Sequence, residues 1–253
     1  MTLRVLVTND DGIDSPGLLA LARTAVNLGW ETVIAAPATE SSGTSAGLTA
    51  AKDNRQVAVE RRELAALPGV EAFAVAAHPG LITLAACHDG FGKSPDVVLS
   101  GVNRGGNVGR AILHSGTVGA ALTAGVNGAR ALAISLDVAL DDDEDPDWSD
   151  AAAVAARILP WMADADEGTV LNVNVPAGEV GPVRWARLAT YGRVQSKVTQ
   201  LDDGLIEVGS VEVEGELEAD TDAALLAEGH VTITPLHSVH EDEVLMRGTP
   251  PGA

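Results

Sequence analysis

The 253-residue sequence contains a single cysteine, Cys87, few aromatic residues and few basic ones. One cysteine excludes a disulfide within the chain and is typical of a reducing compartment. Aromatic residues make up 3% of the chain and hydrophobic residues 46%, so we expect a large core built from Ala, Val and Leu. The 36 acidic residues outnumber the 16 Lys and Arg, which gives a formal net charge of −20. This balance argues against a nucleic-acid polymer or an anionic membrane as partner, because both require a basic surface.

Long apolar segments are also missing. No apolar run reaches the roughly 18 residues that a membrane span requires. The N-terminus has no basic stretch followed by a long apolar one, which is the pattern of a secretory signal. We therefore expect a cytoplasmic protein that does not contact a membrane. The length allows one large domain, or one domain with an appendage.

The chain does contain a repeated alternation of short apolar runs and helical patterns. The expected strands are 4–8, 32–36, 70–75, 96–100, 131–136 and 169–175, and the expected helices are 16–28, 81–87, 115–126 and 151–162. This alternation predicts an α/β fold with a Rossmann-like, mostly parallel sheet and helices on both faces. We assign this catalytic core to residues 1–182.

The pattern changes in residues 183–253, which we interpret as an extension of the core. Polar and apolar residues alternate over 193–217 around Asp203-Gly204, which predicts an antiparallel β-hairpin. A short helix over 220–227 and a strand over 231–235 should follow. Because an isolated hairpin is at best marginally stable, we expect it to pack on the core or on another subunit.

The most informative stretch is Val5-Leu6-Val7-Thr8-Asn9-Asp10-Asp11-Gly12. A brief apolar run that is closed by a turn glycine indicates a buried strand. Asn9, Asp10 and Asp11 should therefore lie at the carboxyl end of this strand. Ligand sites in open α/β sheets lie at that edge. Two adjacent carboxylates repel each other unless a cation lies between them, and a hard divalent cation with oxygen ligands is the simplest candidate.

Three more polar segments should reach the same edge or lie next to it. Loops 41–45 and 101–107 each follow a predicted strand, and His114-Ser115-Gly116-Thr117 opens a predicted helix. The carboxylates, hydroxyls and amides of the loops form a set of hard oxygen ligands suited to Mg²⁺ or Mn²⁺. Backbone N–H groups at a helix start can bind an anion. A metal beside an anion site predicts metal-assisted phosphoryl transfer to water.

These segments resemble those of the survival protein SurE family. The matching stretches are 7–13, 36–37 with 42–45 and 48–49, 100–105 with Asn107, 114–118, 171–176 and 231–236, which together span nearly the whole chain. Any one of them is a weak signal, but four site motifs in this order are specific. The resemblance implies a divalent-metal-dependent phosphatase that acts on nucleoside 5′- and 3′-monophosphates.

The resemblance also implies the roles of individual residues. It implies one divalent metal ion per subunit, bound by Asp10, Asp11, Ser42 and Asn103. It implies phosphate binding by Asn107, Ser115, Gly116 and Thr117. It also implies a Rossmann-like fold with a protruding C-terminal hairpin, through which subunits associate as a homodimer or homotetramer.

Other assignments stay open at this point. Asp10 or Asp11 could orient or deprotonate the attacking water, and His114 could protonate the leaving group or form a pocket wall. Asn107 and Ser115 complete the catalytic candidates. Ser45, His78 and Arg104 are candidate substrate contacts.

One segment departs from the family pattern. Where the family usually has Gly-Thr-Pro-Ala-Asp-Cys, residues 77–82 read Ala-His-Pro-Gly-Leu-Ile. A sugar phosphate or another metabolite is therefore an alternative substrate, and a catalytically silent metal and nucleotide binder is a further alternative. A signalling receiver module also carries an acidic pair after its first strand. It requires a lysine after a late strand, and the only lysines, at positions 52, 93 and 197, do not meet that requirement.

Overall fold

The computed structural model describes residues 2–48, 56–138, 145–191, 194–200, 206–212, 216–239 and 241. Nine of the strands in these ranges form one sheet: β1 (Arg4–Thr8), β2 (Glu31–Pro37), β3 (Val59–Arg62), β4 (Glu71–Val75), β5 (Val97–Arg104), β6 (Arg130–Asp137), β7 (Val170–Pro176), β8 (Val183–Trp185) and β11 (Val231–Leu236). Their order is β3-β4-β2-β1-β5-β6-β7-β11-β8. The run from β4 to β7 is parallel throughout, whereas β3 and β11 are antiparallel to their inner neighbours. The predicted mostly parallel sheet is confirmed.

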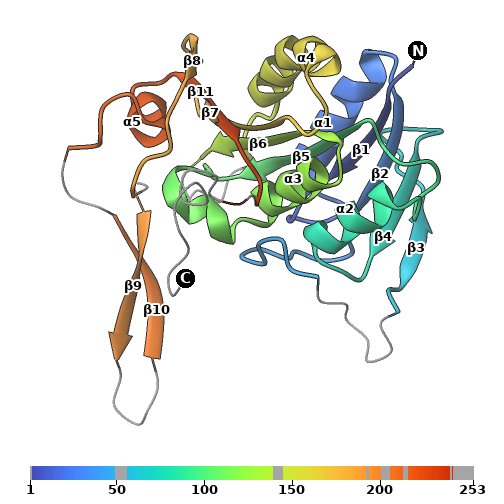
Figure 1. The fold of residues 1–253 in the computed structure, drawn as a ribbon, viewed down its shortest axis with the longest axis horizontal. Coiled ribbons are helices and arrows are strands. Elements are labelled where there is room, and N and C mark those ends of the chain that lie inside the picture. Colours follow the sequence, from blue (N-terminus) through green and yellow to red (C-terminus); the bar gives the residue numbers. More distant parts are fainter. Residues whose placement is uncertain are drawn as a thin grey trace, which may run out of the picture.

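Helices cover both faces of this sheet (Figure 1). The helices are α1 (Pro16–Asn27), α2 (Pro79–Cys87), α3 (Gly116–Val126), α4 (Ser149–Asp164) and α5 (Asp222–Ala227), with a 3₁₀ helix η1 (Gly109–His114). Apolar residues of α1 and α4 lie in one core cluster, and those of α2 and α3 lie in another. The two pairs therefore pack on opposite faces. Within the described ranges, every helix is too short or too polar to cross a lipid bilayer.

Helix α1 shows how closely local sequence signals decide an element. Ser15 caps it, because the Ser15 Oγ accepts a hydrogen bond from Leu18 N at 3.3 Å, and Pro16 occupies the first turn. Both residues favour these positions. Gly29 follows the helix with φ +75°, a conformation that glycine adopts without strain. The predicted start and end of this helix are confirmed.

Three strands differ from the prediction. The edge strands β3 and β8 were not expected from the sequence; their residues are exposed or half-buried, so neither shows an apolar pattern. Strand β5 continues through Arg104, whereas we expected a glycine-rich loop from Gly101. The pairing of β5 with β6 shifts register between Ser100 and Asn103, and the chain resumes the ladder beyond this irregularity.

The C-terminal extension contributes to two structures. Strands β9 (Val194–Gln200) and β10 (Ile206–Glu212) pair in antiparallel fashion, as predicted, and the hairpin projects away from the large sheet (Figure 1). Its predicted turn at 203–204 lies outside the described residues. Strands β8 and β11 instead extend the large sheet. The division of the chain at residues 182 and 183 stays a prediction.

Candidate functional site

The end of β1 forms a tight, buried turn. Asn9 is fully buried, and its side-chain amide both accepts from Gly12 N and donates to Gly12 O, each at 3.1 Å. Gly12 has φ +105°, a region in which other residues are strained. This closed turn fixes the backbone of Asp10 and Asp11, which lie at the carboxyl end of the strand as predicted.

The Asp10 carboxylate lies against the first turn of α3. Asp10 Oδ2 accepts from Thr117 N at 3.2 Å, and Oδ1 accepts from the Thr117 hydroxyl. A Cβ placed on Gly116 would lie 2.8 Å from Asp10 Oδ2, so only glycine allows this approach. Burial raises the pKa of Asp10 above its usual value, and the hydrogen bonds from Thr117 oppose that rise. A helix start favours a negative charge, and here that charge belongs to the protein.

This geometry changes the reading of the predicted phosphate turn. Thr117 is fully buried, and both its N–H and its hydroxyl donate to Asp10. Ser115 caps α3, because its Oγ accepts from Val118 N at 3.1 Å. Both donor groups of Thr117 are therefore engaged by Asp10, and its assignment to phosphate binding stays a prediction. Ser115 is half-buried and adjoins the exposed His114.

The Asp11 side chain is half-buried beside the buried Asp10, and its carboxylate is less completely hydrogen-bonded. Its Oδ2 has no hydrogen-bond partner among the described residues. Burial, then the Asp10 charge, then the Glu40 charge raise the pKa of Asp11 to about 7, and the N–H and the charge of Arg104 oppose this rise. A buried oxygen without a partner, next to a second carboxylate, is what a divalent cation would satisfy.

The loop after β2 packs onto this pair. Ser41 N donates to Asp10 O at 2.7 Å, and the Ser41 hydroxyl is hydrogen-bonded to His78 Nδ1 at the start of α2. Ser42 is exposed, and its hydroxyl donates to Glu40 Oε1 at 2.8 Å. Ser45 donates through its N–H and its hydroxyl to the carbonyls of His114 and Leu113. Ser42 and Ser45 therefore lie in the same loop, and His78 contacts this loop through Ser41.

The end of β5 supplies the third part of the site. Asn103 Nδ2 donates to Arg104 O and to Gly105 O, at 3.2 and 2.7 Å, so its Oδ1 is the atom left for a ligand. Residues 105–108 connect Arg104, whose N–H reaches Asp11, to η1 and the start of α3. Asn107 lies half-buried in this connection.

Two asparagines of β7 contact Asn107, and sequence reasoning did not assign them. Asn172 and Asn174 are fully buried, and both donate to Asn107 O. They belong to Leu171-Asn172-Val173-Asn174-Val175-Pro176, where alternation of polar and apolar residues in a predicted buried strand was the available signal. A strand buried on both faces usually reads as a continuous apolar run, so this alternation marks a polar stripe inside the protein.

Comparisons with known proteins agree with this layout. The family model of the survival protein SurE matches residues 5–197. The 5′-nucleotidase SurE 1 of Burkholderia lata is 37% identical, over 92% of this chain and 90% of its own length. A 5′-nucleotidase SurE of Rhodopseudomonas palustris is 32% identical, over 96% of both chains. The chain belongs to the survival protein SurE family. The crystal structure of the SurE protein from Aquifex aeolicus superposes with a TM-score of 0.77 at 26% identity, over 96% of this chain and 97% of that one.

The four metal ligands implied for this SurE member come from three neighbouring elements. Asp10 and Asp11 follow β1, Ser42 lies in the loop after β2, and Asn103 lies near the end of β5. Among the described residues, no three His, Cys, Asp or Glu side chains cluster as a metal site. The implied donor set is two carboxylates with an amide and a hydroxyl, a combination that would suit a hard cation. The orphaned Asp11 Oδ2 shows that the residues fit such an ion.

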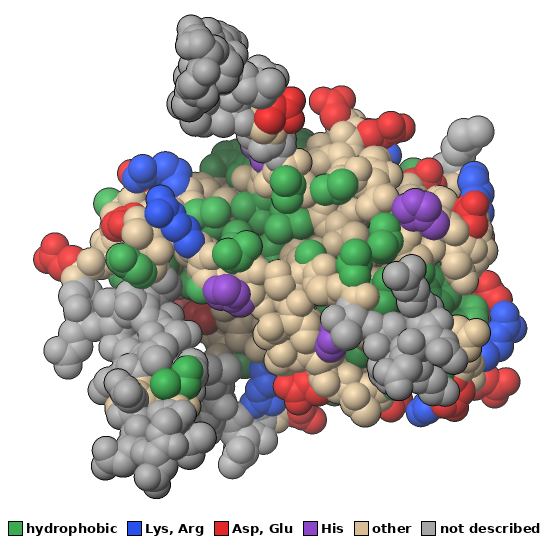
Figure 2. Space-filling view, turned by 60° about the horizontal axis from the view of Figure 1, so that its bottom comes forward, with side chains coloured by type: hydrophobic (Ala, Val, Ile, Leu, Met, Phe, Trp, Pro, Cys, Tyr) green, Lys and Arg blue, Asp and Glu red, His purple; other side chains and the backbone are tan. Residues whose placement is uncertain are grey.

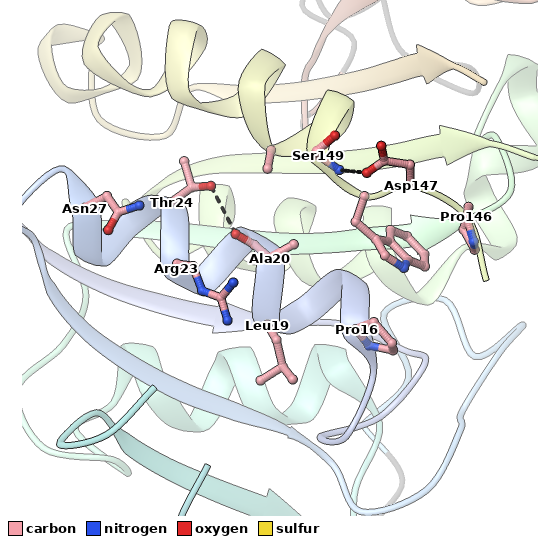
Figure 3. A pocket seen from close by; sticks show the side chains of 11 residues that line it. Pro16, Leu19, Ala20, Arg23, Thr24, Asn27, Pro146, Asp147 and Ser149 are labelled. Carbon is pink, nitrogen blue, oxygen red and sulfur yellow. Dashed lines mark hydrogen bonds between the residues drawn. The ribbon is translucent and has the colours of Figure 1, made fainter. Parts of the chain in front are cut away.

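A surface groove of about 540 Å³ lies elsewhere, between α1 and the start of α4 (Figure 3). It contains none of the predicted site residues. One of its lining residues, Trp148, packs beside Gly17, and a Cβ on Gly17 would lie 2.3 Å from Val102 O. Gly17 therefore lets α1 pack closely on β5, directly before Asn103.

Proposed function

We propose that this chain hydrolyses nucleoside 5′- and 3′-monophosphates to nucleoside and phosphate as a metal-dependent phosphomonoesterase. The observation that carries the proposal is the pair of adjacent carboxylates after β1. The buried Asp10 is held by α3, and Asp11 has a buried oxygen without a partner among the described residues. The relatives named 5′-nucleotidase SurE support the substrate class.

One Mg²⁺ or Mn²⁺ ion per subunit would be held by Asp10, Asp11, Ser42 and Asn103. When bound, such an ion lowers the pKa of a coordinated water and neutralises charge on the phosphate. Ser42 would exchange its present hydrogen bond with Glu40 for this role. Arg104, whose charge lies near Asp11, would contact the substrate on the same side.

The remaining residues would position the substrate and move protons. Asp11 is the better candidate to orient the attacking water, because both oxygens of Asp10 already accept hydrogen bonds from Thr117. Asn107 and Ser115 would contact the phosphate, with Gly116 keeping the approach open. His114, which is exposed and directly precedes Ser115, would protonate the leaving alkoxide.

The structural contact of the altered segment 77–82 does not argue against nucleotides as substrates. His78, its most distinctive residue, is hydrogen-bonded to Ser41 and so supports the loop that carries Ser42. That contact is structural and gives no reason for a different substrate. Figure 2 shows a face of the molecule on which charged side chains lie mostly at the rim.

The assembly and location belong to the same proposal. We expect a cytoplasmic homodimer or homotetramer that associates through the hairpin β9–β10, because the hairpin projects from the body and a lone hairpin is marginally stable (Figure 1).

The direct test is phosphate release from nucleoside 5′- and 3′-monophosphates and from sugar phosphates, with Mg²⁺, with Mn²⁺ and with chelator. We expect turnover of nucleotides that requires the metal. Asp10→Asn should reduce kcat by at least about 100-fold, the size of effect seen when one electrostatic group is lost, and leave the fold intact. Turnover of sugar phosphates alone would redirect the proposal to that class, and metal and nucleotide binding without turnover would indicate a silent binder.

A further inference from the structure

Asn107 is held by three polar side chains of β6 and β7. Asn174 Oδ1 accepts from Asn107 N at 2.7 Å, and Asn174 Nδ2 donates back to Asn107 O at 2.9 Å. Asn172 Nδ2 donates to the same carbonyl at 2.8 Å. The Asn107 side chain in turn donates through Nδ2 to Ser135 Oγ at 2.8 Å. Both the backbone and the amide of Asn107 are therefore fixed.

These three holding residues lie inside the protein. Ser135, Asn172 and Asn174 are all fully buried, whereas Ser and Asn usually lie on the surface. Ser135 pairs with Asn174 across β6 and β7, and Asn172 lies two residues earlier on the same face. Buried polar groups are unfavourable unless they are hydrogen-bonded. Each of these three buried polar residues forms a hydrogen bond with Asn107.

The segment that carries Asn107 is tied at both ends. At one end, Arg104 N reaches Asp11. At the other, Gly109 N donates to the buried Asp222 Oδ2 at 2.8 Å. Between them, residues 105–108 include two glycines, which leave a chain mobile unless it is held. Gly105 N donates to Leu136 O of β6 at 2.8 Å, and Asn107 is the residue through which side chains of the sheet hold the middle of the segment.

We propose that Asn174, Asn172 and Ser135 are positioning residues, a buried clamp that sets the backbone and the amide of Asn107 against the phosphate of the substrate. The proposal rests on the proposed function, since it assigns Asn107 to substrate binding. Asn174 is the central member, because it must donate and accept at once. An aspartate at this position would lose the donor and place a second acceptor opposite Asn107 O.

The clamp acts on substrate positioning rather than on the reacting atoms. The Asn107 amide nitrogen carries two N–H donors, and one of them is given to Ser135 Oγ. The second would donate to a phosphate oxygen. Loss of the clamp should therefore weaken the binding of the phosphate and leave the carboxylates of β1 in place.

The kinetic test compares Asn174→Asp and Asn174→Ala with Thr232→Val. Thr232 faces Asn174 across β7 and β11, is fully buried, and its hydroxyl has no partner among the described residues. We expect both Asn174 variants to raise KM for a nucleoside monophosphate about 10-fold or more with a smaller change in kcat. Thr232→Val should leave both constants unchanged. Wild-type values of KM in both Asn174 variants, or an equal rise of KM in Thr232→Val, would overturn the clamp.

A second readout does not depend on catalysis. Hydrogen exchange of a peptide that covers residues 105–114 should be slow in the wild-type protein and in Thr232→Val, and clearly faster in Asn174→Ala. If the wild-type protein hydrolyses no nucleotide, the proposed function fails, and this exchange still decides whether the clamp exists. Unchanged exchange in Asn174→Ala would refute the clamp even if the enzyme is active.

Discussion

Asp10 shows how one side chain acquires its role from a helix that begins about a hundred residues later. The first turn of α3 supplies an N–H and a hydroxyl from Thr117, and Gly116 leaves room for the carboxylate. A negative charge at a helix start is favourable. These contacts fix the rotamer of Asp10, so the carboxylate is already oriented before a ligand arrives.

Thr117→Val should lower kcat/KM for nucleoside monophosphates. The substitution conserves volume and removes only the hydroxyl that donates to Asp10. Hydrogen bonds to charged groups contribute about 1.5–3 kcal/mol, so we expect a loss of roughly 10- to 100-fold. Steady-state kinetics would measure it, with Thr117→Ser as the control that keeps the hydroxyl. Wild-type kinetics in Thr117→Val would show that this bond does not matter for turnover.

Gly116→Ala should impair activity for a steric reason. The new methyl group would lie 2.8 Å from Asp10 Oδ2 and 2.9 Å from its Cβ, so the carboxylate or the helix start must move. Overpacking a buried site costs about 1–3 kcal/mol, so we expect a moderate loss of thermal stability beside a large loss of kcat/KM. Kinetics and a thermal melt on the same sample separate the two effects. A variant that melts lower but turns over normally would contradict this expectation.

Among the elements, those with local signals were predictable from sequence. Helix α1 begins with a capping serine and a proline, and β1 is a compact apolar run. Both elements were therefore predicted at the positions that they occupy in the structure. Strand β3 reads Val-Glu-Arg-Arg and is mostly exposed, so only its pairing with β4 makes it a strand. Strand β5 passes through Gly101, which looked like the start of a loop, because pairing with β6 resumes after a register shift.

The site was predictable as a set of residues but not as a set of contacts. The spacing of polar segments after strands placed Asp10, Asp11 and Asn103 at one edge. The bonds of Thr117 to Asp10, and of Asn174 to Asn107, join residues 107 and 67 positions apart. Such bonds depend on how the elements pack, and a single sequence carries no local signal for them.

Asp222 joins three segments at the start of α5. Its Oδ1 accepts from Ala189 N and Ala223 N at 2.9 and 2.8 Å, and its Oδ2 accepts from Gly109 N at 2.8 Å. Asp222→Asn replaces one of these oxygens with a donor, so at least one buried N–H loses its partner. We expect the free energy of unfolding to fall by about 1–3 kcal/mol, measured by urea denaturation. Unchanged stability in Asp222→Asn would contradict this role.

The same residue predicts a pH dependence. Burial raises the pKa of Asp222 above its usual value, so the folded state binds the proton more tightly than the unfolded state. Its contribution to stability is therefore full below the ordinary carboxyl pKa of about 3.9 and is lost as the pH rises through the raised value. Denaturation of the wild-type protein and of Asp222→Asn at several pH values should show their difference shrinking as the pH rises. A difference that grows with pH would reverse the sign of this argument.

The whole molecule combines a strongly acidic body with a projecting hairpin. Self-repulsion from a net charge of −20 opposes association, most strongly at low ionic strength, where screening extends to about 30 Å at 0.01 M salt. Any assembly through the hairpin must overcome this repulsion. The equilibrium between monomer and oligomer should therefore respond both to salt, which screens the repulsion, and to removal of the hairpin.

Replacing residues 194–212 with a short Gly-Ser linker should convert the proposed oligomer to a monomer. The hairpin forms its own two-stranded sheet, apart from the nine-stranded one, so the core should keep its melting temperature. Light scattering after size exclusion would give the mass of the wild-type and shortened proteins at low and moderate salt. We expect the wild-type mass to rise with salt and the shortened protein to stay monomeric. An oligomer that survives the deletion would place the interface on the body, and a monomeric wild-type protein at both salts would exclude the assembly.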